Sequence, residues 1–287
     1  MIDLGLSVLF TSLLYVIFKL FPVFKVQTLY AIIANYFTAG LVGVLFFGTR
    51  YDLTVIPMKS WFPGTVALGI LFITVFNILA KTSQTLGVSV ASVASKMSLV
   101  IPILCGLALY NETLGSLQVL GILFALSAVY FVSVKEKTVH IAPSSLLLPL
   151  LVFLGSGAID ASIKYLQDTF VPNGEYPMFS STIFFSAGIA GIFYIAFKAF
   201  KTPLRFRLRN VIGGIVLGVP NYFTVHFLLR ALKNEELNSA AIFTINNVGV
   251  VLFSTLLGIV LFKEKLSPAN WGGIFLAIVS IILVALF

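Results

Sequence analysis

The feature that most constrains this chain is a series of apolar runs, each about as long as a helix that crosses a bilayer. Such a helix needs about 20 apolar residues. Ten runs follow one another, at about residues 2–20, 28–48, 61–83, 88–110, 116–134, 145–166, 177–199, 210–232, 238–261 and 269–287. The breaks between them leave no room for a soluble domain. We therefore expect an all-α integral membrane protein with ten transmembrane helices.

Composition agrees with this interpretation. Of the 287 residues, 59% are hydrophobic and only 10% are charged, whereas soluble domains carry about 25% charged residues. The net charge is +8, and the densest basic run lies at residues 198–210. A basic connection between two spans is typical of a cytoplasmic loop, so we expect no nucleic-acid partner. The first run lacks the basic start of a secretory signal and is expected to be retained.

The two halves of the chain resemble each other. The matched positions are Lys19 with Lys164, Phe37 with Phe185, Gly40 with Gly188, Gly69 with Gly218, Asn77 with His226, Glu112 with Glu264 and Gly121 with Gly273. We expect two five-helix repeats, residues 1–137 and 138–287, in one membrane domain. Because five is odd, the second repeat must enter the membrane from the opposite side, which makes an inverted repeat. In transporters of that topology the substrate binds near the midplane, and alternating access moves it across.

These residues resemble a known family. The five-plus-five arrangement, the stretches "NETLG" and "KEKLS" before the fifth and tenth helices, and "GVSVASVASKMS" at the fourth are similar to the EamA-type drug/metabolite transporter superfamily. The resemblance covers the whole chain. It implies a secondary-active exporter or exchanger, with amino acids and other metabolites as substrates and phosphorylated metabolites or nucleotide sugars as the alternative. It also implies the bacterial inner membrane.

The orientation in the membrane has two conflicting indications. Lys and Arg gather in the odd-numbered connections, which favours a cytoplasmic position for those loops and places both termini outside. The resemblance implies termini inside. We follow the charge bias, because it comes from this sequence itself.

Lys96 is the most unusual charged residue, because it lies about eight residues inside the fourth run. A charge near the bilayer centre costs at least about 2.5 kcal/mol and needs a partner or a water-filled cavity. Ser92 shares its helix face at i, i+4 spacing, and Ser89 lies one turn further. We predict that Lys96 and Ser92 line the substrate site; snorkelling of the lysine to the interface is the alternative.

Asp160 and Lys164 stand four residues apart in the sixth run, so a helix would place them on one face. Asp160 has no acidic counterpart in the first half, where Tyr15 takes the matching place, and it is a candidate proton-carrying group. A coupling proton is thus one expected partner. Lys164 is close to a helix end, and its alternative role is to reach the headgroups.

Further polar residues within the runs complete the predicted substrate site. Pro220 is expected to break the eighth helix, which would bring polar side chains to a cavity. Asn247 is preferred to Asn246 because it joins Thr244 at i, i+3 spacing. The added candidates are Asn77, Asn221, Tyr222, His226, Thr244 and Asn247. Glu264 is instead expected to lie at the positive end of the helix that follows it.

The alternative functions are a membrane-embedded enzyme and a channel. The chain has one cysteine, Cys105, and two histidines, and it contains no HExxH, GxSxG or GxxxxGK[ST]. We therefore expect no enzyme, no metal and no cofactor. The expected partners are the lipid bilayer and a small substrate, zwitterionic or anionic because the lysines outnumber Asp160. A monomer and a homodimer both remain open.

Overall fold

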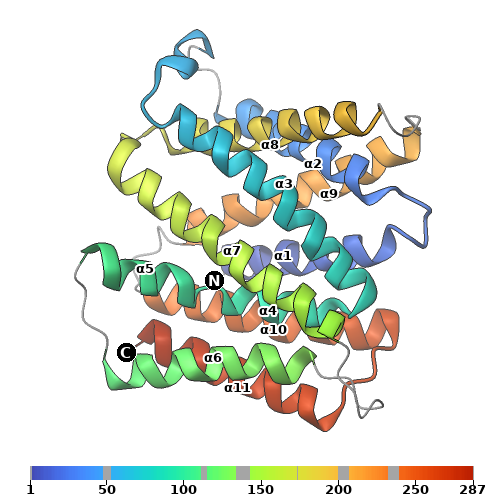
Figure 1. The fold of residues 1–287 in the computed structure, drawn as a ribbon, viewed down its shortest axis with the longest axis vertical. Coiled ribbons are helices and arrows are strands. Elements are labelled where there is room, and N and C mark those ends of the chain that lie inside the picture. The colour runs from blue at the N-terminus through green and yellow to red at the C-terminus, as the bar shows by residue number, and fades with distance from the viewer. Residues whose placement is uncertain are drawn as a thin grey trace. The chain divides into compact units, whose positions relative to one another are not determined.

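The computed structural model describes residues 2–286 apart from 48–52, 111–114, 134–142, 173, 200–206 and 232–238. Figure 1 shows its helices. They are α1 (Ile2–Leu20), α2 (Thr28–Phe47), the short 3-10 helix η2 (Leu53–Met58), α3 (Phe62–Thr85), α4 (Val88–Met97), α5 (Val100–Tyr110), α6 (Ser116–Ser133), α7 (Pro143–Phe170), α8 (Tyr176–Ala199), α9 (Leu208–Ala231), α10 (Ser239–Phe262) and α11 (Pro268–Leu286). Glu112 and most of the basic run 198–210 lie outside the described residues.

Eight segments of the described chain are long and apolar enough to cross a membrane. Two shorter apolar helices, Ser116–Val132 and Pro268–Val284, coincide with the fifth and tenth runs. In lipid, a helix satisfies all of its backbone polar groups within itself, which is why apolar runs of this length fold in this way. The chain is an all-helical, multi-pass membrane protein.

The fourth run, expected as one helix, is instead divided into α4 and α5. The division follows from Pro102, which has no N–H to donate to the carbonyl of Ser98 four residues earlier. The N–H of Ile101 donates to that carbonyl at 2.9 Å, in a tighter turn. Backbone that leaves the helix at membrane depth is tolerated where protein buries it or where it lines a cavity. The break between α4 and α5 is therefore a candidate position for a functional site.

The expected break at Pro220 is wrong. Helix α9 continues through this residue from Leu208 to Ala231. A proline inside a membrane helix can be accommodated when neighbouring groups satisfy the freed carbonyl. The position of a proline in the sequence does not distinguish these two outcomes.

The helices form two compact units. Unit 1 contains Met1–Leu20, Ile78–Asp160 and Phe223–Phe287, and unit 2 contains Phe21–Asn77 and Ala161–Tyr222. Each unit combines segments from both halves of the sequence. The repeat boundaries at residues 137 and 138 describe a different division and stay a prediction.

In unit 1, α6 and α11 pack closely, and Figure 1 shows them side by side. A Cβ atom on Gly121 would lie 2.6 Å from Cγ2 of Val284, and a Cβ atom on Gly273 would lie 2.7 Å from Cγ2 of Val132. Low numbers on one helix thus face high numbers on the other, so the two helices are antiparallel. Since Gly121 matches Gly273, the same contact is made twice, with the roles exchanged.

Unit 2 contains a second contact of this kind, between α2 and α8. A Cβ atom on Gly40 would lie 3.1 Å from Cζ of Phe185, and one on Gly188 would lie 2.8 Å from Cε2 of Phe37. Phe37 is the sequence match of Phe185, and Gly188 is the match of Gly40. This contact too is therefore made twice, with the roles exchanged. Small residues allow helices in lipid to approach closely, and the glycines serve that purpose here.

This packing predicts a difference between two adjacent glycines of α11. Gly273→Ala would place its methyl group 2.7 Å from the backbone nitrogen of Val132, whereas nothing lies within 4 Å of a Cβ atom on Gly272. We expect Gly273→Ala to be less stable than Gly272→Ala by about 1–3 kcal/mol, the cost of overpacking. Unfolding of the purified variants in detergent measures this difference. Equal stability of the two variants would contradict the close approach of α6 and α11.

Candidate functional site

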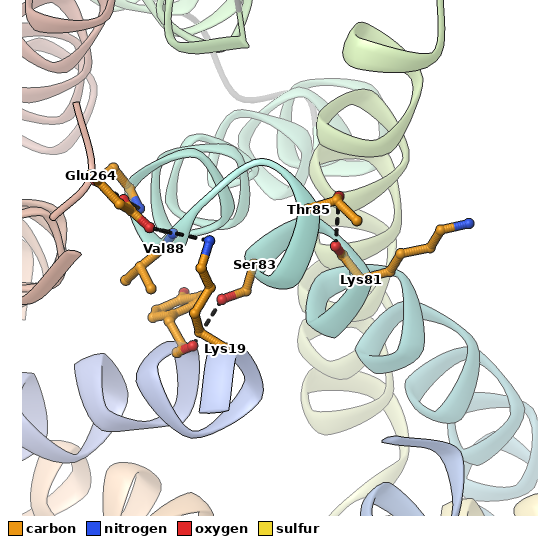
Figure 2. Close-up of polar contacts among 8 residues, drawn as sticks. Lys19, Lys81, Ser83, Thr85, Val88 and Glu264 are labelled. Atoms are coloured by element: carbon orange, nitrogen blue, oxygen red, sulfur yellow. Dashed lines mark hydrogen bonds and ion pairs between the residues drawn. The ribbon is translucent and has the colours of Figure 1, made fainter. Parts of the chain in front are cut away.

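The start of α4 is held by Glu264, from the connection between α10 and α11. Its Oε1 accepts a hydrogen bond from the N–H of Val88 at 2.7 Å, and its Oε2 accepts one from the hydroxyl of Ser89 at 3.1 Å. Nζ of Lys19 lies 3.6 Å from Oε1, as Figure 2 shows. A carboxylate at a helix N-terminus satisfies free N–H groups and complements the helix dipole.

The expectation for Glu264 was thus right about the kind of contact and wrong about the helix. The carboxylate binds the N-terminus of α4 and not that of α11, the helix that follows it. Helix α11 is capped by Ser267, whose Oγ accepts a hydrogen bond from the N–H of Asn270 at 3.1 Å. Because Ser267 caps α11, Glu264 is available to cap α4, which is distant from it in the sequence.

Neighbouring helices add to this attachment within unit 1. The hydroxyl of Ser83 on α3 donates to the carbonyl of Tyr15 on α1 at 2.8 Å, and Nε2 of Gln84 donates to the carbonyl of Phe18 at 3.0 Å. Lys81, on the same helix, is exposed and projects away from Glu264 (Figure 2). The N-terminal end of α4 is therefore tied to α1 and to the α10–α11 connection, and Lys81 provides a lysine outside this network.

The serines of α4 have structural partners. Ser92 is buried, and its hydroxyl donates to the carbonyl of Ser89 at 3.0 Å within the same helix. Ser89 contacts Glu264. Both hydroxyl groups thus have structural partners, and the predicted role of Ser92 at the substrate stays a prediction.

Lys96 lies at the other end of α4, directly before the break, and is half-buried. It is the ninth of the 18 residues in the span Val88–Cys105, which puts it in the middle of that span. The carboxylate of Asp160 on α7 is close enough for the two opposite charges to attract each other. Ser98, at the break, lies near this carboxylate, and its hydroxyl donates to the carbonyl of Ser95. A cation and an anion from two helices thus meet at a mid-span helix break.

Helix α7 presents Asp160 to this break. Gly157 packs directly against Ile101 of α5, and Asp160, three residues further along, lies on the same face of the helix. Asp160 is the fifteenth of the 25 residues in the span Leu146–Phe170 and is exposed. A charged group at this depth is expected to face a cavity or a partner, and Asp160 has a partner.

Three further residues of this cluster, Tyr15, Ser95 and Ser98, were not predicted. Tyr15 of α1 hydrogen bonds with the side chain of Ser95 and lies near Asp160, and only 3% of Tyr15 is exposed. The signal was available, because Tyr15 is the sequence match of Asp160. We define the cluster as Tyr15, Ser95, Lys96, Ser98 and Asp160.

The candidates in unit 2 are described separately. Nδ2 of Asn77 donates to the carbonyl of Ile73 in its own helix at 2.7 Å. Nδ2 of Asn221 donates to Oδ1 of Asn35 at 3.2 Å, and both asparagines are buried. These bonds give Asn77 and Asn221 structural partners. Tyr222 is buried and Lys164 is exposed. Their predicted role at the substrate stays a prediction.

Three candidates remain in unit 1. The ring of His226 packs edge-on against Phe223 and Phe227, with centroid distances of 6.0 and 5.3 Å. Asn247 is half-buried, whereas Asn246 is buried and accepts a hydrogen bond from Ser7 at 2.9 Å. The side chain of Thr244 lies outside the described part of the structure. The preference for Asn247 over Asn246 as a substrate-site residue stays a prediction.

Lys59, which the sequence places in a loop, has a partner in unit 2. Its Nζ lies 2.6 Å from Oε1 of Glu175, and Oε2 of Glu175 accepts a hydrogen bond from Nε1 of Trp61 at 2.9 Å. The hydrogen bond from Lys59 lowers the pKa of Glu175, which lies outside the spans. Lys59 therefore contributes to the stability of this unit.

Comparison with known proteins places this geometry in a family. The family model of the EamA-like transporter family matches residues 144–286. An uncharacterized protein of Haemophilus influenzae is 30% identical over 221 residues, which are 76% of this chain and 74% of that protein. The crystal structure of another protein shares the fold, with a TM-score of 0.57 and 16% identity over 98% of this chain and 97% of that one. The chain belongs to the EamA-like transporter family, a family of membrane transporters within the drug/metabolite transporter superfamily.

Proposed function

We propose that this protein is a secondary-active transporter of a small zwitterionic or anionic metabolite, such as an amino acid, and that Lys96 binds the anionic group of the substrate. The observation that carries the proposal is the position of Lys96, in the middle of a span and beside a helix break. A half-buried cation at a break in a transporter helix is suited to an anionic group, because opposite charges attract more strongly at membrane depth than in bulk water.

The reciprocal glycine contacts support an inverted repeat of five helices. When antiparallel helices make the same contact twice with exchanged partners, the two-fold axis that relates them runs perpendicular to the helices. For helices that cross a membrane, such an axis lies in the membrane plane, as in transporters with inverted repeats. This topology favours transport by alternating access. We propose that the protein works in this way as an exporter or an exchanger in the bacterial inner membrane.

The test separates the proposal from a channel and from an enzyme. Purified protein is first screened by thermal shift against amino acids, organic acids, phosphorylated metabolites and nucleotide sugars, because a ligand of the folded state raises its apparent stability. The best ligand is then loaded into proteoliposomes. A transporter gives a saturable flux that unlabelled substrate on the opposite side accelerates. A flux that neither saturates nor responds to that substrate would favour a channel, and chemical change of the ligand would favour an enzyme.

The proposed orientation gives a further prediction for two exposed residues of unit 2. Val23 lies in the connection before α2 and is 67% exposed, and Met58 lies in the connection after it and is 87% exposed. The charge bias places the first connection in the cytoplasm. In a Cys105→Ser background, an impermeant thiol reagent added to intact cells should label Met58→Cys and leave Val23→Cys unlabelled. The reverse result would establish cytoplasmic termini.

A further inference from the structure

The cluster at the helix break contains one cation and one anion. Lys96 comes from the end of α4, directly before the break, and Asp160 from the face of α7 whose Gly157 packs against Ile101, directly after the break. The two opposite charges therefore lie near each other. The other member that can ionise is Tyr15 of α1, which is neutral in its ordinary state. With Lys96 positive and Asp160 negative, the empty cluster has no net charge.

A bare anion and a zwitterion would change this balance differently. A bare anion that binds Lys96 comes close to the carboxylate of Asp160, and two like charges in a medium of low dielectric repel each other strongly. A zwitterion can place its anionic group at Lys96 and its cationic group at Asp160. Every charge then has an opposite neighbour, and the loaded cluster is as neutral as the empty one.

Asp160 has the capacity for such a second contact. An ionised carboxylate has about four acceptor positions on its two oxygens. Ser98 lies near this carboxylate, but its hydroxyl donates to the carbonyl of Ser95. The side chain of Asp160 is exposed, so a ligand can reach its acceptor positions.

We infer that Asp160 determines the specificity of this site, binding the ammonium group of a zwitterionic substrate and rejecting the corresponding anion that lacks it. This inference rests on the proposed function, in which Lys96 binds the anionic group. It adds Asp160 as the partner of the substrate's ammonium group. It also gives the reason why a bare anion binds less well, which is repulsion by the Asp160 carboxylate.

The experiment compares L-α-amino acids with the carboxylic acids that lack only the amino group. Purified full-length protein is screened against both sets by thermal shift, and the pair with the largest shift is measured by calorimetry. The wild type should bind the amino acid about tenfold more tightly or better, as expected for a hydrogen bond between charged groups. Asp160→Asn should reduce the ratio to about one, and Asp160→Glu should retain the preference.

Asp168→Asn is the matched control, because Asp168 is an exposed carboxylate on the same helix. It should leave the ratio unchanged. The inference is overturned if the wild type binds no member of the amino-acid set, or binds both members of the pair equally. An Asp160→Asn variant that keeps the tenfold preference overturns it as well. If Asp160→Asn does not fold, equal binding of both members of the pair by the wild type still overturns the inference, and so does an Asp160→Glu variant that folds and loses the preference.

These outcomes separate the inference from the proposed function. A wild type that transports an anion without preferring the amino acid disproves the role of Asp160. The proposed transport function is not affected by that result. A wild type that gives no saturable flux with any metabolite class disproves the proposed function itself.

Discussion

Replacing Glu264 with glutamine is expected to lower the unfolding free energy of the protein by about 2 kcal/mol. Glutamine has nearly the same shape, but it carries no charge for Lys19 and has one acceptor oxygen where Glu264 uses both. The N-terminus of α4 then loses a hydrogen bond to a charged acceptor, and Lys19 loses its partner. Thermal unfolding of the purified variant should show a midpoint several degrees below that of the wild type.

Two controls make this result specific. Lys265→Gln changes an exposed neighbour in the same connection and should leave the midpoint near the wild-type value. The double variant Lys19→Met, Glu264→Gln should lose less stability than the two single variants together, because both remove one shared ion pair. A Glu264→Gln variant as stable as the wild type would show that the carboxylate does not hold α4.

The second large effect is expected for Lys96→Met. Methionine keeps much of the length of the lysine stem and removes its charge, so binding of the substrate should weaken by about 1.5–3 kcal/mol, the range for hydrogen bonds to charged groups. That loss corresponds to about tenfold to a hundredfold in the dissociation constant. Folding should be retained, because the carboxylate of Asp160 is exposed and does not become a buried charge without a partner.

The matched control for this variant is Lys81→Met, which removes an exposed lysine from α3. It should transport the identified substrate like the wild type. Lys96→Arg should restore only part of the activity, since a planar guanidinium does not reproduce a compact ammonium. If Lys96→Met transports with wild-type rate and affinity in proteoliposomes, Lys96 is a structural lysine and the anion site must be abandoned.

The fold could be predicted from the sequence because lipid leaves few alternatives. Every backbone polar group within the bilayer needs a partner in the same element, so apolar runs of sufficient length become helices. The break between α4 and α5 was missed because the apolar composition of 88–110 continues through Pro102. A proline weakens a helix at a known place, but the surrounding contacts decide whether the helix ends there.

The candidate site was predicted in part. Lys96 and Asp160 could be found because a charge in the middle of an apolar run is costly and needs an explanation. Their mutual attraction could not be foreseen, because it depends on how α7 packs against α5 at Gly157. For the same reason the sequence pairs Asp160 with Lys164, which lies four residues further along the same helix. The predicted partner was the local one, and the structure brings in a distant one.

The reciprocal glycine contacts also explain why some positions of the two halves still resemble each other. Gly40 faces Phe185 while its match Gly188 faces Phe37, the match of Phe185. A larger side chain at either glycine meets an aromatic ring that belongs to the other half, so neither half can drift at these positions without a compensating change in its counterpart. Lys96, by contrast, is matched by Val248, so the two halves have diverged at this position. Sequence divergence between the halves is therefore limited where they touch each other and free where the two members of a pair have acquired different tasks.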